Sequence, residues 1–355
     1  MRTFILKSAF FIVPFFILFI ITKFLYSETL GPDLLRIGYI PNFNKNYRNN
    51  FSKKKEEKFI LLSAAKEKKY KIMTIGDSFS EQGADGYKNY LAEDYSILHI
   101  DRFITNNQIQ TLVDLLNGNF FNNYEIEYVV LQNVERHLMD QIENIKIDKK
   151  LDIFQLDSII NINKPIENNK PIENNFKYEF FSKTTIKFPL YYLPKYFTTH
   201  NYLSAGVVYN YDLDSKKLFS NNSNKLLFYY YDIESTLQNN EIQNSIKLNN
   251  ILNHISKILK GKNIKLIFLP SPDKYDLYYN NIVNKKSLSK PIFFDNFKSL
   301  NKEYIYIDLK NIFSKFIYTK PDLYYYDDTH WSPIASEIIS NTIKDLITKN
   351  EKGTN

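Results

Sequence analysis

The sequence predicts a mixed α/β fold, in which helices cover both faces of a parallel sheet and an apolar segment precedes the folded part. Short apolar stretches of strand character alternate along the chain with longer stretches whose apolar residues recur at helical spacing. Such alternation is typical of parallel sheets. Polar residues follow the ends of several predicted strands, which is where functional sites lie in open parallel sheets.

The N-terminal segment predicts a membrane anchor over residues 1–27. Residues 4–26 are almost wholly apolar, and at ~1.5 Å per residue they reach roughly 34 Å, enough to cross a bilayer core. Arg2 and Lys7 favour a cytoplasmic N-terminus, which leaves the rest of the chain outside the cytoplasm. No Ala-x-Ala cleavage site follows, so we expect an uncleaved anchor and not a signal peptide.

Composition argues against several classes of function. The formal net charge is +7, but lysines are interspersed with acidic residues and form no long basic run, so we expect no nucleic-acid partner. The chain has no cysteine, which excludes a thiolate nucleophile, a disulfide and a cysteine-ligated metal. Patterns of the type His-x-x-x-His and Gly-rich phosphate loops are also absent. We therefore expect neither a metal nor a cofactor.

After the anchor, the chain divides into a lead-in and one large domain. Residues 28–69 are expected to form a lead-in linker with little core of its own, and residues 70–350 the catalytic domain. Apolar patterning predicts the elements of that domain. The strands are expected at 71–75, 95–100, 124–131, 226–231, 264–269 and 304–309, and the principal helices at 107–116, 241–259 and 334–347.

An irregular insertion is expected at about residues 148–224. It contains the hexapeptide Lys-Pro-Ile-Glu-Asn-Asn twice in tandem, at 164–169 and 170–175, which is typical of a surface loop. Residues 188–194 are rich in aromatic residues and proline. They either line a sugar cleft or pack the insertion against the main domain.

Ser78 is the predicted nucleophile. A strand-like stretch runs into Gly76-Asp77-Ser78, which predicts a sharp turn that presents the serine hydroxyl at the head of a helix. There the backbone N–H of Ser78 would lie at the positive end of the helix and stabilise a developing oxyanion.

A serine nucleophile needs a base, and the base needs a carboxylate to orient it. His330 lies in the stretch Asp327-Asp328-Thr329-His330-Trp331, so either aspartate can meet that need from the same loop. The other four histidines have no neighbouring carboxylate in a comparable loop, and His137 is the reserve candidate because it follows a predicted strand end.

Together, the Gly-Asp-Ser turn and the later Asp-Thr-His-Trp stretch resemble the SGNH (GDSL-like) hydrolase superfamily. The Asp-Thr-His-Trp wording and the segment 270–275 are similar to its alginate O-acetyltransferase-type branch. The resemblance covers roughly residues 70–140 and 262–345. It implies an SGNH-type, flavodoxin-like, three-layer fold with a Ser-His-Asp triad, and its Asp-x-His spacing favours Asp328 over Asp327.

The sequence departs from the superfamily pattern at the oxyanion hole. No Gly-x-Asn-Asp block follows the strand that ends near residue 131, and Gln132 and Asn133 stand there instead. Beside the Ser78 N–H, the expected side-chain donor is therefore Asn133, with Gln132 second. The glycine donor stays open. Supporting roles fall to the remaining motif residues, which are Asp77, Arg136 and Trp331.

The resemblance implies a function. We expect an O-acyltransferase anchored in the bacterial inner membrane, with its domain in the periplasm, that transfers an acetyl group to a cell-envelope or exported glycan. A membrane-bound O-acyltransferase is the expected source of the acyl group. The alternatives are an esterase that uses the same triad and a glycan-binding subunit without activity.

Overall fold

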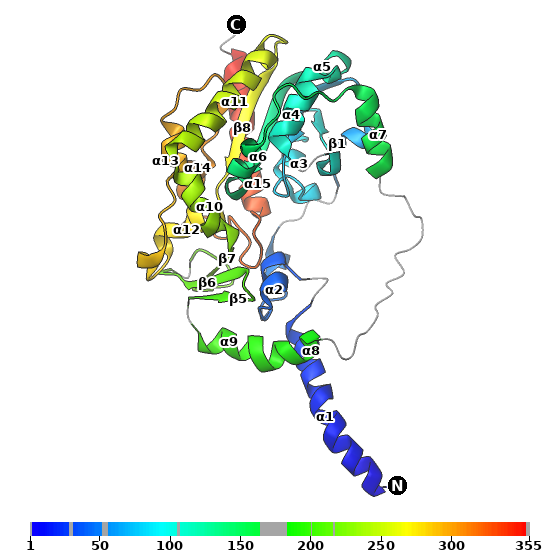
Figure 1. Cartoon of the computed structure of the whole chain (residues 1–355), viewed down its shortest axis with the longest axis vertical. Coiled ribbons are helices and arrows are strands. Elements are labelled where there is room, and N and C mark those ends of the chain that lie inside the picture. The colour runs from blue at the N-terminus through cyan, green and yellow to red at the C-terminus, as the bar shows by residue number, and fades with distance from the viewer. Residues whose placement is uncertain are drawn as a thin grey trace.

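The structure is a computed structural model that describes residues 2–27, 31–51, 56–104, 107–163, 183–199, 201–215 and 217–352. An α/β body stands at one end of the long N-terminal helix α1 (Arg2–Leu25) (Figure 1). Helix α1 is long and apolar enough to cross a membrane. The predicted hexapeptide repeat lies outside the described residues.

The centre of the body is a sheet of six strands, all parallel, as predicted. Because parallel strands share a direction, their carboxyl ends meet at one edge. From edge to edge the strands are β1 (Ile60–Leu61), β3 (Ile97–His99), β2 (Lys69–Ile75), β4 (Glu125–Val134), β8 (Lys265–Ser271) and β9 (Ile305–Tyr306).

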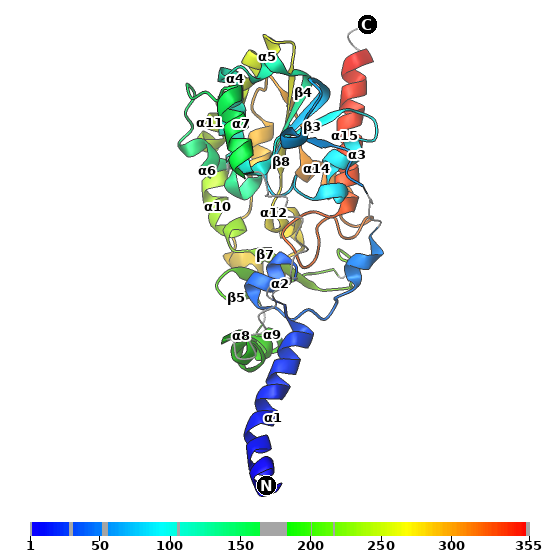
Figure 2. The ribbon, with the colours of Figure 1, turned by 90° about the vertical axis from the view of Figure 1, so that its right-hand side faces the viewer.

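Helices cover both faces of this sheet, which confirms the predicted three-layer arrangement (Figure 2). Alternate strand residues point to opposite faces, so Met73 and Ile72 enter different cores. One core includes α4 (Gln108–Asn117), α6 (Leu138–Glu143), α11 (Ile242–Lys260) and α13 (Phe293–Lys298), and the other includes α3 (Tyr87–Leu91), α12 (Lys274–Tyr278), α14 (Leu309–Ser314) and α15 (Pro333–Lys352).

The insertion contributes a second, antiparallel sheet at the end of the body nearest α1 (Figure 1). Its strands are β5 (Tyr202–Ser204), β6 (Val208–Asp212) and β7 (Lys225–Tyr229), so the strand predicted at 226–231 belongs to this sheet. The remaining helices are α2 (Asp33–Gly38), α5 (Phe120–Asn123), α7 (Ile153–Asn163), α8 (Lys183–Lys187), α9 (Leu193–Thr198) and α10 (Tyr231–Asn240).

The lead-in is part of the body. Leu34, Leu35, Ile40 and Tyr47 are each at most 7% exposed and lie in the same hydrophobic cluster as the sheet. Burying a side chain of this size stabilises a fold by about 1.5–3 kcal/mol. Residues 33–51 therefore pack against the body and reach the loop of His330, where the expectation was a linker with little core.

Candidate active site

Ser78 lies in a tight turn directly after β2. A Cβ atom at Gly76 would lie 1.9 Å from Ser80 Oγ and 2.7 Å from Gln132 Oε1, so only glycine fits there. The Asp77 carboxylate accepts hydrogen bonds from Phe79 N at 2.9 Å and from Val134 N at 2.5 Å. Asp77 thus fastens the turn to the end of β4 and leaves Ser78 at its apex.

The prediction that Ser78 stands at the head of a helix is wrong, although the helix pattern at Tyr87, Tyr90 and Leu91 is confirmed by α3. Residues 77–80 form a hydrogen-bonded turn, and the next α-helix starts only at Tyr87. The cause is the Asp77 side chain, which takes the Phe79 N–H and so offers the backbone an alternative to a helical turn. Among the described residues, the Ser78 N–H has no acceptor, so it is available to an oxyanion without the support of a helix.

His330 contacts Ser78 although 252 positions separate them. Its Nε2 lies 2.8 Å from Ser78 Oγ, and its Nδ1 lies 2.6 Å from Asp328 Oδ1. Burial alone would raise the pKa of Asp328, but the hydrogen bond and charge of His330, with the charge of Arg48, lower that pKa below its usual value. An ionised carboxylate behind the imidazole is what a serine–histidine relay requires.

The other aspartate of the motif points elsewhere. Asp327 accepts from Tyr47 Oη at 2.9 Å and from Arg48 Nη2 at 2.6 Å. The same Arg48 Nη2 lies 3.0 Å from Asp328 Oδ2, so one guanidinium joins both carboxylates. Its positive charge offsets the repulsion between two partly buried anions that are adjacent in sequence.

A third carboxylate approaches the imidazole from the lead-in. Asp33, the first residue of α2, accepts from Thr329 N at 2.9 Å and from Thr329 Oγ1 at 2.6 Å. Its Oδ2 lies 3.7 Å from His330 Nδ1. Burial and the neighbouring Asp328 carboxylate raise the pKa of Asp33 to about 6.

Lys274 holds the loop of His330 through three hydrogen bonds. This side chain is fully buried, and its Nζ donates to the carbonyl oxygens of Tyr325, Tyr326 and Asp328 at 2.8–3.0 Å. An ammonium group has three donors, so one lysine satisfies three loop carbonyls. Lys274 belongs to the segment 270–275 that carries part of the family resemblance.

The structure does not bring Gln132 and Asn133 to Ser78 Oγ as oxyanion donors. Strand β4 continues to Val134 and pairs with β8 along its whole end, so both residues lie inside the sheet, fully buried. Gln132 Oε1 accepts from Ser80 Oγ and Asp77 N, and its Nε2 donates to Ser271. Asn133 Nδ2 donates to glutamines of α4 and α6 on the opposite face.

Two further motif residues support the site from behind. Arg136 is buried, and its Nη1 lies 2.9 Å from Asp232 and 2.8 Å from Asp273. Trp331 is fully buried, and its ring packs on Phe79, which in turn contacts the His330 ring at 4.8 Å. Neither side chain is exposed for stacking on a substrate.

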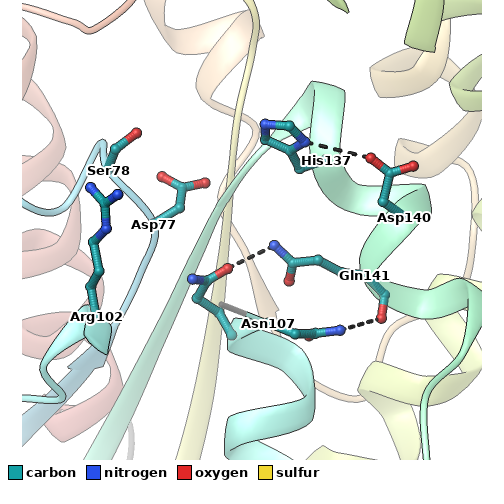
Figure 3. Close-up of a pocket in the computed structure, with 8 residues that line it drawn as sticks. Asp77, Ser78, Arg102, Asn107, His137, Asp140 and Gln141 are labelled. Carbon is teal, nitrogen blue, oxygen red and sulfur yellow. Dashed lines mark hydrogen bonds and ion pairs between the residues drawn. The ribbon is translucent and has the colours of Figure 1, made fainter. Parts of the chain in front are cut away.

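Ser78 lies between two pockets. The first has a volume of about 390 Å³, and in it the Arg102 guanidinium points toward Ser78 (Figure 3). The reserve histidine, His137, lines its far wall and pairs with Asp140 at 3.5 Å. The second pocket, of about 240 Å³, lies on the imidazole side and is lined by Arg48, Ser78, Glu81, Gln82, Asp85, Tyr325, Asp328 and His330.

Among the described residues, one cluster has the spacing of a metal site, and it is part of this relay. Ligand atoms of Asp33, Asp328 and His330 lie within 4.8 Å of one another. Each of these side chains already has a hydrogen-bond partner in the cluster or in Thr329. These three side chains therefore fit a proton relay in which each polar group already has a partner from the protein.

Sequence reasoning missed the supporting residues Asp33, Tyr47, Arg48, Arg102 and Lys274. One signal was available for two of them. The chain has only five arginines beside 41 lysines, and Arg48, Arg102 and Arg136 all lie at or behind the site. In so lysine-rich a chain, an arginine is a candidate for a position where the planar guanidinium makes hydrogen bonds that a lysine ammonium cannot.

The fold and these side chains define an α/β protein with an SGNH-like domain. Residues 227–355 match the family model described as the SGNH hydrolase-like domain of the acetyltransferase AlgX. The match includes Lys274, Asp328 and His330 and does not include Ser78. It confirms the resemblance to the alginate O-acetyltransferase-type branch and supports an acetyltransferase or SGNH hydrolase-like function. No curated protein and no solved structure gives a significant match.

Proposed function

We propose that this protein is a membrane-anchored O-acyltransferase that moves an acetyl group onto a hydroxyl of a cell-envelope or exported glycan. The observation that carries the proposal is the continuous hydrogen-bond chain from Ser78 Oγ through His330 to Asp328. The family match adds acetyl transfer as the chemistry.

In the first half-reaction, Ser78 Oγ attacks the donor carbonyl while its proton passes to His330 Nε2. The oxyanion forms beside the Ser78 N–H and on the side of Arg102, where positive charge stabilises it. The intermediate collapses when His330 returns the proton to the leaving group, and an acetyl ester of Ser78 remains.

In the second half-reaction, His330 takes the proton of a glycan hydroxyl as that oxygen attacks the acetyl-serine. Collapse of the intermediate releases the glycan ester, and the proton returns to Ser78 Oγ. Asp328 stays ionised throughout and stabilises the imidazolium that forms twice per cycle. The two pockets on either side of Ser78 offer separate room for donor and acceptor.

The position of the site near α1 supports delivery of the acyl group from the membrane. Asp33 lies eight residues after Leu25, the last residue of α1. An extended chain covers no more than ~3.6 Å per residue, so Asp33 lies within about 29 Å of the end of α1. Since Asp33 contacts the His330 loop, a membrane-bound O-acyltransferase in the inner membrane could present its acyl group to Ser78 on the periplasmic side.

The test uses the full-length chain with Ser78→Ala and, as matched control, Ser158→Ala on the surface of α7. Only Ser78→Ala should abolish both labelling by a fluorophosphonate and O-acetylation of the glycan in the native cell. With a chromogenic acetyl ester, added glycan should accelerate turnover and become acetylated. If added glycan leaves the turnover rate unchanged and is not acetylated, the protein is an esterase. If the wild-type protein does not react with the fluorophosphonate, it is a binding subunit.

A further inference from the structure

A short helical rod lies across the end of α1. It consists of α8, a π-helical turn over residues 188–192 and α9, and it is called the crossbar (residues 183–198) below. Figure 1 shows it running across the end of α1, between that helix and the body, and Figure 2 shows it end-on. In Figure 1 the crossbar lies beside the end of α1 that is nearest the body.

Direct contacts fix the crossbar to α1. Thr22 Oγ1 of α1 donates to the Thr185 carbonyl at 3.2 Å. A column of stacked rings then joins both ends of the π-helical turn to the chain that follows α1. Ring centroids are 5.0 Å apart for Phe188–Tyr26, 5.3 Å for Tyr26–Tyr39 and 4.5 Å for Tyr39–Tyr192. Stacking of this kind resists rotation of the crossbar about α1.

The opposite side of the crossbar is apolar and exposed. Leu190 is 61% exposed, Phe197 is 64% exposed and Ile186 is 39% exposed. These three residues, called the exposed stripe below, are spaced four and seven positions apart, as apolar residues on one face of a helix are, although the rod contains a π-helical turn. Thr185 and Phe188 are buried against α1 and the body, so the exposed stripe faces away from the protein core.

The depth of the crossbar along α1 matches a membrane interface. The 24 residues of α1 reach ~36 Å, whereas the hydrocarbon core of a bilayer is ~30 Å thick. Thr22, the contact point, lies three residues before the end of α1, or about 4.5 Å along the axis. Interfacial helices bury their apolar face by ~5–10 Å at the boundary between headgroups and acyl chains.

The flanking residues also suit that boundary. Tyr191 is 58% exposed beside the stripe, and tyrosine is enriched where membranes meet water. Lys183 and Lys187 are exposed on the same rod, and lysine stems lie along apolar surface while the ammonium reaches the headgroups. Their charge favours a surface that carries anionic lipid.

We propose that the crossbar lies in the outer interface of the membrane that α1 spans, with Ile186, Leu190 and Phe197 among the acyl chains. This inference rests on the anchoring part of the proposed function. A single span leaves the body free to rotate about α1 and to tilt. A second attachment, fixed to α1 by the ring column, holds the body upright and sets the height and orientation of Ser78 above the bilayer.

The absence of cysteine makes the test direct, because each introduced cysteine is unique. Four full-length variants carry one nitroxide each, at Leu190→Cys, Phe197→Cys, Val13→Cys in the middle of α1, and Leu237→Cys. Leu237 is 67% exposed on α10 and is the matched control for Leu190. The protein is reconstituted in pure lipid vesicles of phosphatidylcholine and phosphatidylglycerol, and relaxation by oxygen is compared with relaxation by a water-soluble nickel complex.

Relative to the Leu237 label, labels at Leu190 and Phe197 should show weaker relaxation by nickel and stronger relaxation by oxygen, because oxygen concentrates in the hydrocarbon while the nickel complex stays in water. If the Leu190 and Phe197 labels are relaxed as the Leu237 label is while the Val13 label lies deep in the bilayer, α1 is a membrane anchor but the crossbar proposal fails. If the Val13 label also contacts water, anchoring itself fails. If the Leu190 label is protected from nickel in native membranes but not in pure lipid vesicles, the crossbar contacts a protein partner and the lipid proposal fails. None of these outcomes depends on Ser78 chemistry.

Discussion

The two halves of the relay are held by different parts of the chain. Ser78 is held by the sheet, because Asp77, Gln132 and the end of β4 fix its turn. The loop of His330 is held by side chains remote from it in sequence, namely Asp33 and Arg48 of the lead-in and Lys274 after β8. The nucleophile therefore depends on the centre of the fold, whereas the base depends on Lys274 and on the lead-in that follows α1.

This difference has a consequence for how the site fails. A change under Ser78 disturbs buried hydrogen bonds of the sheet and should lower stability together with activity. A change in the lead-in acts on partly exposed groups, so it should misplace the imidazole while the body stays folded. Variants of the two halves can separate these outcomes.

The largest effect is expected from Asp328→Asn. The amide would present the wrong group to His330 Nδ1 and favour the wrong imidazole tautomer, which lowers kcat on the order of 10³–10⁴-fold in a serine triad. Asp327→Asn is the matched control at the neighbouring residue. Its kcat should fall far less, because Asp327 contacts Tyr47 and Arg48 and not His330. Hydrolysis of an acetyl ester measures both, and equal losses would contradict the assignment of Asp328.

Gly76→Ala tests the half that the sheet holds. The new Cβ would collide with Ser80 and Gln132, which costs about 1–3 kcal/mol in overpacking. A shift of the Ser78 turn by ~1 Å would lower kcat about 10²-fold. Gly86→Ala is the control, since its Cβ would meet no atom closer than 3.4 Å. A thermally stable, active Gly76→Ala variant would show that the turn tolerates movement.

The same contrast explains what the sequence could predict. The parallel sheet, Ser78 and the pair of candidate aspartates follow from local patterns, because strand periodicity and short motifs are written in neighbouring residues. Asn133 and Gln132 were expected to face Ser78 because a strand end cannot be located to within two residues by pattern, and β4 runs on to Val134.

The contacts of Asp33 and Arg48 could not be predicted, because they depend on how a polar segment folds back over the sheet. Asp33 lies 296 positions from Thr329, and Arg48 lies 280 positions from Asp328. The local pattern of residues 31–51 does not predict that these residues contact Thr329 and Asp328. Residues 188–194 of the crossbar were likewise expected either to line a sugar cleft or to pack the insertion, because the direction of an exposed stripe is visible only in three dimensions.

Arg48→Gln tests the half that the lead-in holds. The variant leaves Asp327 and Asp328 without their shared cation, and hydrogen bonds to charged groups contribute about 1–3 kcal/mol. A loss of ~1.4 kcal/mol in positioning lowers kcat about tenfold. Arg48→Lys keeps the charge without the fork and should recover part of the rate. KM for a small acetyl ester should stay unchanged, and a rise in KM alone would place Arg48 in substrate binding.

The smallest effect is expected from Asp33→Asn, and it depends on pH. Because the pKa of Asp33 is raised from 3.8 to about 6 in the folded protein, the folded state binds the proton more tightly than the unfolded state. Wild-type stability therefore gains from Asp33 at low pH and loses that gain as the pH rises from about 4 to about 6. The Asn variant lacks this loss, so its thermal midpoint should rise relative to wild type across that window and run parallel above it.

Above pH 6 the Asp33 charge lies 3.7 Å from the ring of His330, where it would stabilise the imidazolium that forms during the reaction, and an accessible ion pair contributes about 0.2–1 kcal/mol. Asp33→Asn should thus lower kcat by less than about fivefold at pH 7. Asp94→Asn, at an exposed ion pair with Lys344, controls for any acid-to-amide change. A loss as large as that of Asp328→Asn would make Asp33 the orienting carboxylate, and the lead-in would then orient the base.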